Sequence, residues 1–377
     1  MTNSGSQSLT GRALIAAGGT GGHVYPALAV ADVLTDRGWS VDWIGTSRGI
    51  EQRLVPAAGL PLHYLSISGL RGKTLIARIK GFLLLGFALW QSLRLMRRIR
   101  PDVILGMGGY AAGPAGFAAW MSRRPLVIHE QNAVAGTTNR WLAPLASQVL
   151  SGLPGSFSHR QDASVVGNPV RAQLRPVDRS ELGQLAAFSE SRPLRVLMLG
   201  GSLGAAPLNA LLPAACDVLC EDGFGDRVSI WQQCGARNRV DAEQHWRHSR
   251  FSEPRVEDYI DDMSAAYQWA DVVIARAGAL TISELAATAT PAALIPLPHA
   301  IDDHQTANAK VLSTANAAVL IPQREATAER LAEQLIAWIR DPQSLLEMGR
   351  AASRVAAAEA AQRVADIVQE VARANVR

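Results

Sequence analysis

Cysteine is scarce in this chain, with three in 377 residues. Cys216, Cys220 and Cys234 lie in one half of the sequence, and an odd number without the spacing of a disulfide framework indicates reduced thiols. Cys216 and Cys220 have the spacing of half a metal site, but no second pair of cysteine or histidine residues supports one. We therefore expect both to be buried side chains of a helix.

Long apolar runs and basic leader segments are also missing. No stretch reaches the ~20 apolar residues that span a bilayer, and residues 1–11 are polar, without the basic-then-apolar layout of a signal peptide. The formal net charge is only +4, which is too mild for a nucleic-acid-binding protein. We expect a chain that is neither exported nor embedded in a membrane, and no nucleic-acid partner.

Apolar residues, in contrast, make up 48% of the chain and charged residues 19%. This balance is typical of a well-packed enzyme, and 377 residues exceed what one core usually holds, so two domains are expected. Short apolar segments alternate with helical patterns, as in the doubly wound α/β fold with parallel strands buried on both faces. The expected strands are residues 12–17, 41–45, 102–105, 126–129, 194–199, 228–232, 271–275 and 292–296.

A weak internal repeat divides the chain. One apolar segment is followed by Gly18-Gly19-Thr20-Gly21-Gly22 and another by Gly200-Gly201-Ser202-Leu203-Gly204. Each pattern predicts a strand, a glycine turn and a helix start, the opening of a Rossmann-like domain. Residues 175–193 are polar with prolines near both ends, which is typical of a linker. We expect domains at 1–170 and 171–344 facing a central cleft, with a C-terminal helix, about 345–377, packing back onto the first.

Glycine turns of this kind bring backbone N–H groups and a helix N-terminus close to an anion. A dinucleotide fingerprint fits poorly, because Val24 occupies the third glycine position and Asp42 lies inside a strand rather than at its end. A purely structural turn remains an alternative for either turn alone. His23 follows the first turn at a helix start, where an imidazole can accept a proton; a structural hydrogen bond is the alternative.

Seven segments then occur in order along the chain: residues 18–23 (GGTGGH), 108–114 (GGYAAGP), 129–136 (HEQNAVAG), 167–171 (GNPVR), 200–205 (GGSLGA), 276–284 (RAGALTISE) and 303–308 (DHQTAN). Together they resemble the MurG family of bacterial peptidoglycan glycosyltransferases. Each segment alone is weak evidence, whereas the ordered set spans almost the whole chain and is specific.

The resemblance implies transfer of N-acetylglucosamine (GlcNAc) from UDP-GlcNAc to the C4 hydroxyl of the muramyl sugar in lipid I, giving lipid II with inversion. It also implies the GT-B architecture, with UDP-GlcNAc bound mainly by the second domain and lipid I by the first, at the cytoplasmic face of the bacterial inner membrane. Two alternatives stay open. One is a related transferase that uses another lipid such as diacylglycerol, since fold alone does not separate them; the other is a UDP-sugar-binding module without catalysis.

A donor site is implied as well. Glu284 corresponds to the acid that accepts both ribose hydroxyls, Ile260 to the backbone contact with uracil and Gln305 to the contact with GlcNAc. The helix that begins near Ala279, with Gly278 allowing close approach, would bind the diphosphate. The other positions carried over to the donor site are Thr20, Gly21, Gly22, Asn132, Arg171, Ser202, Leu280, Thr281, Ile282 and Ser283.

An Asp-x-Asp motif for a metal does not occur, and the pairs Asp261-Asp262 and Asp302-Asp303 lack its alternation. Backbone amides, a helix dipole and the Ser202 hydroxyl would then stabilise the departing diphosphate, and we expect neither a metal nor a cofactor. Inversion requires a base that takes the acceptor proton. His23 is the first candidate, and Glu130, at the end of an expected strand, is the second.

Positive charge collects in residues 70–100, which contain eight basic residues and no acid. The uncharged segment 81–90 between them is rich in leucine and phenylalanine and ends at Trp90. Basic flanks around a short apolar centre are typical of a helix lying on an anionic membrane, and we expect this segment to bind the membrane surface. A buried domain helix with solvated ends is the alternative.

Overall fold

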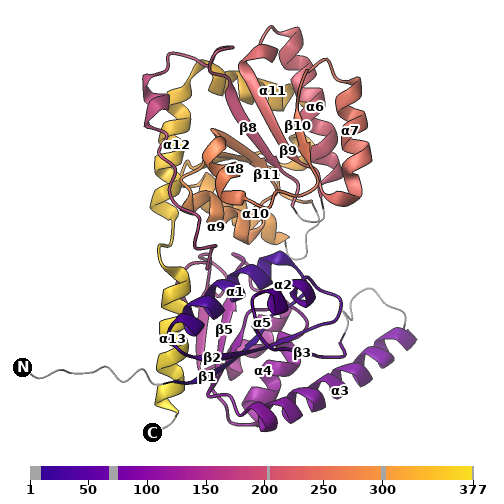
Figure 1. The fold of residues 1–377 in the computed structure, drawn as a ribbon, viewed down its shortest axis with the longest axis vertical. Coiled ribbons are helices and arrows are strands. Elements are labelled where there is room, and N and C mark those ends of the chain that lie inside the picture. The colour runs from indigo at the N-terminus through magenta and orange to yellow at the C-terminus, as the bar shows by residue number, and fades with distance from the viewer. Residues whose placement is uncertain (1–9, 68–74, 202–203, 299–302, 376–377) are drawn as a thin grey trace, which may run out of the picture. The chain divides into compact units, whose positions relative to one another are not determined.

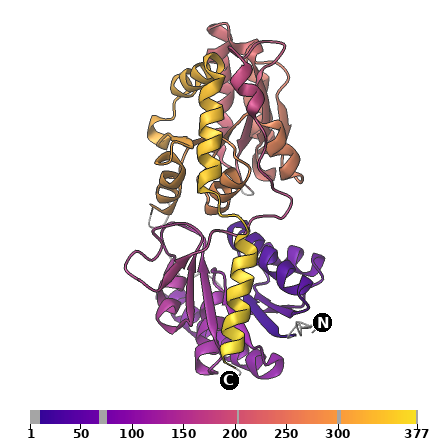
Figure 2. The same ribbon diagram turned by 90° about the vertical axis from the view of Figure 1, so that its left-hand side faces the viewer.

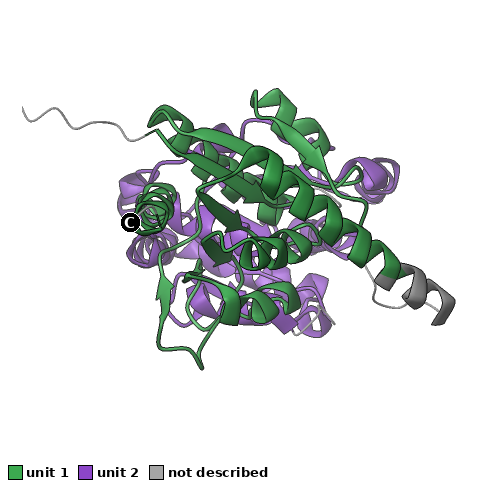
Figure 3. Ribbon diagram, turned by 90° about the horizontal axis from the view of Figure 1, so that it is seen from below, with its two compact units in different colours: residues 1–171, 359–377 green, residues 172–358 purple. Residues whose placement is uncertain are grey.

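The computed structural model describes residues 10–67, 75–201, 204–298 and 303–375. The chain forms two compact units, residues 1–171 with 359–377 and residues 172–358 (Figures 1 and 3). Each unit contains one parallel sheet covered by helices, as the alternation of apolar segments and helical patterns predicts.

The sheet of the first unit has seven parallel strands in the order β3-β2-β1-β4-β5-β6-β7. The order reverses between β1 and β4, which makes the carboxyl ends of these two strands the switch point where α/β sheets bind ligands. The strands are β1 (Arg12–Ala16), β2 (Ser40–Gly45), β3 (Leu62–Tyr64), β4 (Val103–Gly106), β5 (Leu126–Glu130), β6 (Gln148–Ser151) and β7 (Ala163–Val165).

The sheet of the second unit has six parallel strands in the order β10-β9-β8-β11-β12-β13. Counted from the first strand of each unit, both sheets share the order 3-2-1-4-5-6, so the repeated glycine turns reflect a repeated fold. The strands are β8 (Leu194–Leu199), β9 (Val228–Gln233), β10 (Arg255–Glu257), β11 (Val272–Ala275), β12 (Ala292–Leu294) and β13 (Ala318–Leu320).

All eight strands expected from the sequence are confirmed, to within two residues at their ends. The five that the sequence did not predict are β3, β6, β7, β10 and β13, and each has only three or four residues. Four of them form the edges of the two sheets. These four edge strands contain at most one buried residue each, so they lack the continuously buried pattern of the central strands.

Alternate residues of the central strands pack into two hydrophobic cores, one on each face of the first sheet. Ile15 and Leu105 pack with α1 and α13 on one face, and Leu14 and Ile104 pack with α3 and α4 on the other. This alternation follows from the period of two along a strand. The helices of this unit are α1 (Gly21–Asp36), α2 (Glu51–Ala57), α3 (Leu75–Ile99), α4 (Ala112–Met121), α5 (Thr137–Leu142), the short η1 (Ala143–Leu145) and α13 (Ala360–Ala374).

Helices of the second unit surround one large core. Cys216 and Cys220 both lie in α6; Cys216 is buried, which raises the pKa of its thiol, but Cys220 is only half-buried, so the expectation of two buried cysteines is wrong for Cys220. The α-helices are α6 (Ala206–Glu221), α7 (Arg239–His248), α8 (Met263–Trp269), α9 (Ala279–Ala287), α10 (His304–Ser313), α11 (Ala328–Arg340) and α12 (Pro342–Val355). The short ones are η2 (Ser180–Gln184), η3 (Gly225–Arg227), η4 (Ala236–Asn238) and η6 (Gln323–Glu325).

The C-terminal segment that packs on the first unit is shorter than the sequence suggests. Residues 345–358 belong to the second unit, because Leu345 and Leu346 of α12 enter its core. The return to the first unit is made by α13, which runs along the first unit at the yellow end of the chain (Figure 2). Its Val364 and Val368 lie one helical turn apart and pack against the first sheet.

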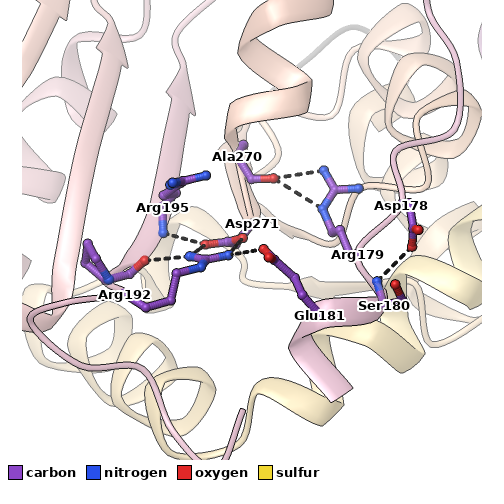
Figure 4. Close-up of polar contacts among 9 residues, drawn as sticks. Asp178, Arg179, Ser180, Glu181, Arg192, Arg195, Ala270 and Asp271 are labelled. Atoms are coloured by element: carbon purple, nitrogen blue, oxygen red, sulfur yellow. Dashed lines mark hydrogen bonds and ion pairs between the residues drawn. The ribbon is translucent and has the colours of Figure 1, made fainter. Parts of the chain in front are cut away.

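Residues 175–193 are not a free linker, contrary to the expectation from their polarity. Leu182 and Phe188 are fully buried in the core of the second unit. Arg192 forms two hydrogen bonds of 2.8 Å with the carboxylate of Asp271, which raises the pKa of Arg192 (Figure 4). The segment is therefore part of the second unit.

Arg179 explains how so polar a segment can be buried. Arg179 is 6% exposed and donates six hydrogen bonds, one to the hydroxyl of Thr290 and five to backbone carbonyl oxygens beside the ends of α8 and α9. Figure 4 shows the two that it donates to Ala270. Burial lowers the pKa of Arg179 to about 10, so the side chain remains a cation at neutral pH. Carbonyl groups at helix C-termini carry partial negative charge, which compensates the buried cation.

Candidate functional site

The turn after β1 brings His23 to the switch point of the first sheet. Gly19 has a φ of +95°, a conformation that glycine adopts without strain. Thr20 caps α1, and its carbonyl oxygen accepts a hydrogen bond of 3.2 Å from the N–H of His23. His23 therefore stands in the first turn of α1 and is half-buried.

The turn after β4 packs directly against the turn after β1. A Cβ atom on Gly109 would overlap the carbonyl oxygen of Gly18, and one on Gly108 would lie 3.0 Å from two atoms of the His23 ring. Both glycines also have positive φ. Only glycine allows this close approach, which fixes the place of the imidazole.

Glu51, for which no role was predicted from the sequence, stabilises the first glycine turn by hydrogen bonding. Its side chain is fully buried, and it accepts hydrogen bonds from the N–H of Gly19 (2.9 Å) and from the N–H and hydroxyl of Thr46 (2.8 Å each). A Cβ atom on Gly18 or Gly49 would overlap its carboxylate. The sequence feature that could have indicated this role is a glutamate with a glycine two positions before it, Gly49, outside any predicted turn.

Glu130 anchors the loop that follows β5. One carboxylate oxygen accepts from the N–H and the side-chain amide of Asn132 (3.0 Å each), and the other accepts from the N–H of Gly136 (3.0 Å) and the amide of Asn139 (2.9 Å). The residue is 2% exposed. These four donors occupy the lone pairs that a base would use.

Gln131 connects His23 to the interior. Its Oε1 lies 2.8 Å from Nδ1 of His23, while its Nε2 lies 3.1 Å from both Nδ1 and the carbonyl oxygen of His129. Nε2 of His129 lies 3.0 Å from the carbonyl oxygen of Gly167, and the amide of Asn168 donates to the carbonyl of Gln131 (2.9 Å). Neither Gln131 nor His129 was predicted to have a role from the sequence, although both lie in the HEQNAVAG segment.

Arg171 belongs to the first unit rather than opening the second, as do the other residues of the GNPVR segment. Its guanidinium carbon lies 4.4 Å from the centroid of the Tyr25 ring, the geometry of a cation–π contact. The segment follows β7, and its Gly167 and Asn168 are tied to the end of β5, which explains why it packs with the first sheet.

In the second unit, α9 begins directly after β11, at the switch point. Gly278 is its N-cap, and the first hydrogen bond within the helix runs from the N–H of Ile282 to the carbonyl of Gly278 (3.0 Å). The N–H groups of Ala279, Leu280 and Thr281 therefore have no acceptor within the helix, and the positive end of the helix dipole lies among them. Because the Ile282 side chain is fully buried, it can offer a ligand only its backbone.

Three further residues that are expected at the donor site lie in or next to helices of the same unit. Glu284, on the second turn of α9, is 6% exposed, and the hydroxyl of Tyr267 donates to it (3.0 Å). Gln305, near the start of α10, accepts a hydrogen bond from the N–H of Leu297 (2.9 Å). Ile260 is 2% exposed and lies just before α8. Ser202 lies outside the described residues.

Among the residues that the structure describes, no three His, Cys, Asp or Glu side chains are grouped so that they could hold a metal ion. Asp262 instead caps α8, accepting from the N–H of Ala265 (2.9 Å). Asp303 precedes α10 and accepts from the hydroxyl of Thr306 (2.7 Å).

Both halves of the chain match one family. Residues 13–151 match the N-terminal domain of glycosyltransferase family 28, and residues 195–367 match its C-terminal domain. The chain belongs to glycosyltransferase family 28. Its two Rossmann-like units are those of the GT-B fold.

Relatives of this family 28 chain are similar over nearly their whole length. A protein of Stutzerimonas stutzeri is 50% identical over 95% of this chain and 98% of its own, and one of Pseudomonas paraeruginosa is 48% identical over 97% and 100%. Both are named UDP-N-acetylglucosamine–N-acetylmuramyl-(pentapeptide) pyrophosphoryl-undecaprenol N-acetylglucosamine transferase. The crystal structure of Acinetobacter baumannii MurG matches with a TM-score of 0.80 and 37% identity, over 96% of this chain and 99% of that one.

Large apolar side chains are exposed on three helices of the first unit of this family 28 chain. Leu83, Phe87 and Trp90 of α3 follow one another at helical spacing and are 71%, 48% and 52% exposed, and Trp120 of α4 and Trp141 of α5 are also exposed. The opposite face of α3 is buried against α4 and the first sheet, so α3 is not a fully buried domain helix. Within the described residues, no helix has the length and apolar character needed to cross a membrane. Residues 70–74 of the expected membrane-binding segment lie outside the described residues.

Burial of His129 predicts a pH-dependent stability. Desolvation lowers the pKa of this fully buried imidazole below its value of about 6.5 in the unfolded chain. Below about pH 6.5, the unfolded chain therefore binds a proton at His129 that the folded chain does not bind. As a result, the free energy of unfolding falls as the pH drops below this value, by at most ~1.4 kcal/mol per pH unit. Urea unfolding between pH 5 and 8 measures the effect, and His129→Gln should lack this part of the slope. Identical slopes for the two proteins would contradict the prediction.

Proposed function

We propose that this family 28 enzyme transfers GlcNAc from UDP-GlcNAc to the C4 hydroxyl of the muramyl sugar in lipid I, giving lipid II with inversion at the anomeric carbon. The observation that carries the proposal is near full-length identity of up to 50% to relatives named for this transfer, combined with the family match of both units. Fold similarity alone would not suffice, because a putative UDP-N-acetylglucosamine 2-epimerase from Listeria monocytogenes has the same fold at 14% identity and a TM-score of 0.66.

The second unit binds the donor in this proposal. Breaking the bond between sugar and phosphate leaves negative charge on UDP, and the N–H groups of Ala279, Leu280 and Thr281 at the start of α9 are placed to stabilise it without a metal. Glu284, less than two turns further along α9, binds the ribose hydroxyls, Gln305 the GlcNAc hydroxyls and the backbone of Ile260 the uracil. The remaining donor contacts are Ile282 through its backbone, Ser202, Ser283, Thr20, Gly21, Gly22, Asn132 and Arg171.

The first unit binds lipid I and supplies the base, for which His23 is preferred to Glu130. Both oxygens of Glu130 already accept two hydrogen bonds each from their own loop, and the residue is 2% exposed. His23 is half-buried at the switch point, and only its Nδ1 is committed to Gln131. The imidazole takes the proton of the C4 hydroxyl as that oxygen attacks the anomeric carbon and UDP leaves with the bonding electrons.

Turnover with two lipid acceptors tests the activity and the proposed diphosphate site together. With UDP-GlcNAc, we expect product from a lipid I analogue and none from diacylglycerol, at the same rate in EDTA as in added Mg²⁺. The rate is independent of metal because amide groups and the helix dipole stabilise the leaving diphosphate. Glycosylation of diacylglycerol alone would favour the alternative acceptor, donor binding without turnover would favour a binding module, and loss of activity in EDTA would refute the metal-free site.

Two substitutions separate donor binding from proton transfer. We expect His23→Ala to lower kcat by about 10²–10⁴-fold with little change in the KM for UDP-GlcNAc, because only the proton acceptor is lost. Glu284→Ala should raise the KM for UDP-GlcNAc by on the order of 10- to 100-fold, the cost of losing hydrogen bonds to a charged acceptor. Steady-state kinetics measures both, with His248→Ala and Glu333→Ala as exposed controls. An unchanged kcat in His23→Ala would show that another group is the base.

We also propose that the exposed face of α3, α4 and α5 binds the cytoplasmic surface of the inner membrane peripherally. Leu83, Phe87 and Trp90 supply an apolar stripe, and exposed arginines such as Arg97 and Arg98 lie at the C-terminal end of the same helix. Apolar side chains beside cations match the interface of an anionic leaflet. Here the head group of a lipid-linked acceptor is accessible.

Acidic substitutions test this surface. We expect Leu83→Glu with Phe87→Glu to weaken binding to vesicles containing phosphatidylglycerol by at least ~10-fold, because apolar burial is lost and negative charge is added. Turnover of a water-soluble lipid I analogue should stay near that of the wild type. Val240→Glu, at a 66% exposed apolar position of α7, is the matched control. Vesicle co-sedimentation that is equal for all three proteins would exclude this face as the membrane-binding surface.

A further inference from the structure

A chain of hydrogen bonds in the first unit determines where the proton of His23 lies. The chain runs from His23 through Gln131 to His129 and ends at the carbonyl oxygen of Gly167, with separations of 2.8, 3.1 and 3.0 Å. Gln131 is 1% exposed and His129 is fully buried, so water does not compete for these contacts.

The direction of each hydrogen bond follows from the groups that can only accept. The carbonyl oxygen of Gly167 accepts, so Nε2 of His129 carries a proton. Because burial keeps His129 neutral, its Nδ1 carries a lone pair and also accepts. Nδ1 and the carbonyl oxygen of His129 are thus two acceptors facing the same atom of Gln131.

Two facing acceptors fix the orientation of the Gln131 amide. Its NH₂ group must face His129, because the flipped amide would place Oε1 against two lone-pair-bearing atoms. Oε1 then faces His23, and an oxygen can only accept there. The proton of the neutral His23 ring is therefore on Nδ1.

We propose that Gln131 is a positioning residue that holds His23 in the Nδ1-protonated tautomer, so that Nε2 receives the proton of the acceptor hydroxyl. This inference rests on the proposed role of His23 as base. When Nε2 takes the proton, the ring becomes an imidazolium whose Nδ1–H still donates to Oε1 of Gln131, and the excess proton then passes to solvent. His129 acts one step further away by orienting the Gln131 amide.

The size of the expected effect follows from what a wrong tautomer costs. In serine proteases, a substitution that reverses the tautomer of the base histidine lowers kcat by about 10⁴-fold with the geometry intact. Loss of Gln131 frees the ring to adopt either tautomer rather than enforcing the wrong one. We therefore expect a smaller loss, on the order of 10- to 100-fold, confined to kcat.

Nitrogen NMR of the full-length enzyme labelled with ¹⁵N-histidine tests the proposal directly. The His23 signals, assigned by their absence in His23→Gln, should report a proton on Nδ1 and none on Nε2 in the wild type. In Gln131→Met we expect a mixture of tautomers. Gln131→Glu keeps an acceptor opposite Nδ1 of His23, and a protonated second oxygen can still donate to His129, so this variant should keep the wild-type tautomer. A wild-type ring protonated on Nε2 would overturn the proposal without any variant having to fold.

Kinetics of the same proteins gives an independent measurement. Gln131→Met should lower kcat by about 10- to 100-fold with the KM for UDP-GlcNAc unchanged, and Gln131→Glu should retain at least ~10-fold more kcat than Gln131→Met. Gln232→Met is the matched control, because Gln232 is also fully buried and bridges two side chains, Trp246 and Asn209, outside the site. It should lose stability but keep kcat.

The outcomes separate this inference from the proposed function. If His23→Ala lowers kcat but Gln131→Met does not, the positioning role is wrong and the base assignment stands. If His23→Ala leaves kcat unchanged, the base assignment is wrong, and Gln131 then positions a ring that is not the base. Equal losses of kcat in Gln131→Met and Gln232→Met would show that Gln131 has only a structural role.

Discussion

The reversal of strand order next to β1 and next to β8 is the constraint on which the candidate site depends. At each reversal, the turns after two neighbouring strands leave toward opposite faces of the sheet, so their backbone groups are not covered by a crossover helix. In the first unit these turns carry His23 and Gly108; in the second they lead into α6 and α9. In the proposed mechanism, the same topology therefore serves two chemical purposes, a proton acceptor in one unit and an anion-binding helix start in the other.

Backbone dipoles, rather than counter-ions, compensate several buried charges in this chain. Glu51 and Glu130 accept hydrogen bonds mainly from the N–H groups and side chains of tight loops, and Arg179 donates mainly to carbonyl oxygens. Such groups are fixed by the fold and need not reorganise when a charge is placed among them. Stabilising a departing diphosphate at the start of α9 uses the same physical means, which is why the proposed mechanism needs no metal.

Sequence patterns predicted what depends on local periodicity and missed what depends on distant contacts. Eight strands, none of them at a sheet edge, and the helix starts at Gly21 and Ala279 were predicted, because buried strands and glycine turns have readable patterns. The contacts of Gln131 with His23 and of Glu51 with Gly19 join residues 108 and 32 positions apart, which no local pattern reveals. Residues 175–193 were interpreted as a linker, because the polarity of a sequence does not reveal that Arg179 donates to five acceptor atoms inside the second unit.

His129, Glu130 and Gln131 at the end of β5 show how strand geometry places adjacent residues in different hydrogen-bond networks. Side chains alternate between the two faces of a strand, so His129 and Gln131 project to one side and Glu130 to the other. The first pair reaches Gly167 and His23, while Glu130 reaches the loop from Asn132 to Asn139. A carboxylate and an imidazole that are neighbours in sequence are thereby kept in separate hydrogen-bond networks. Burial lowers the pKa of His129 against the opposing charge of Glu130, and a neutral His129 is what orients the Gln131 amide toward His23.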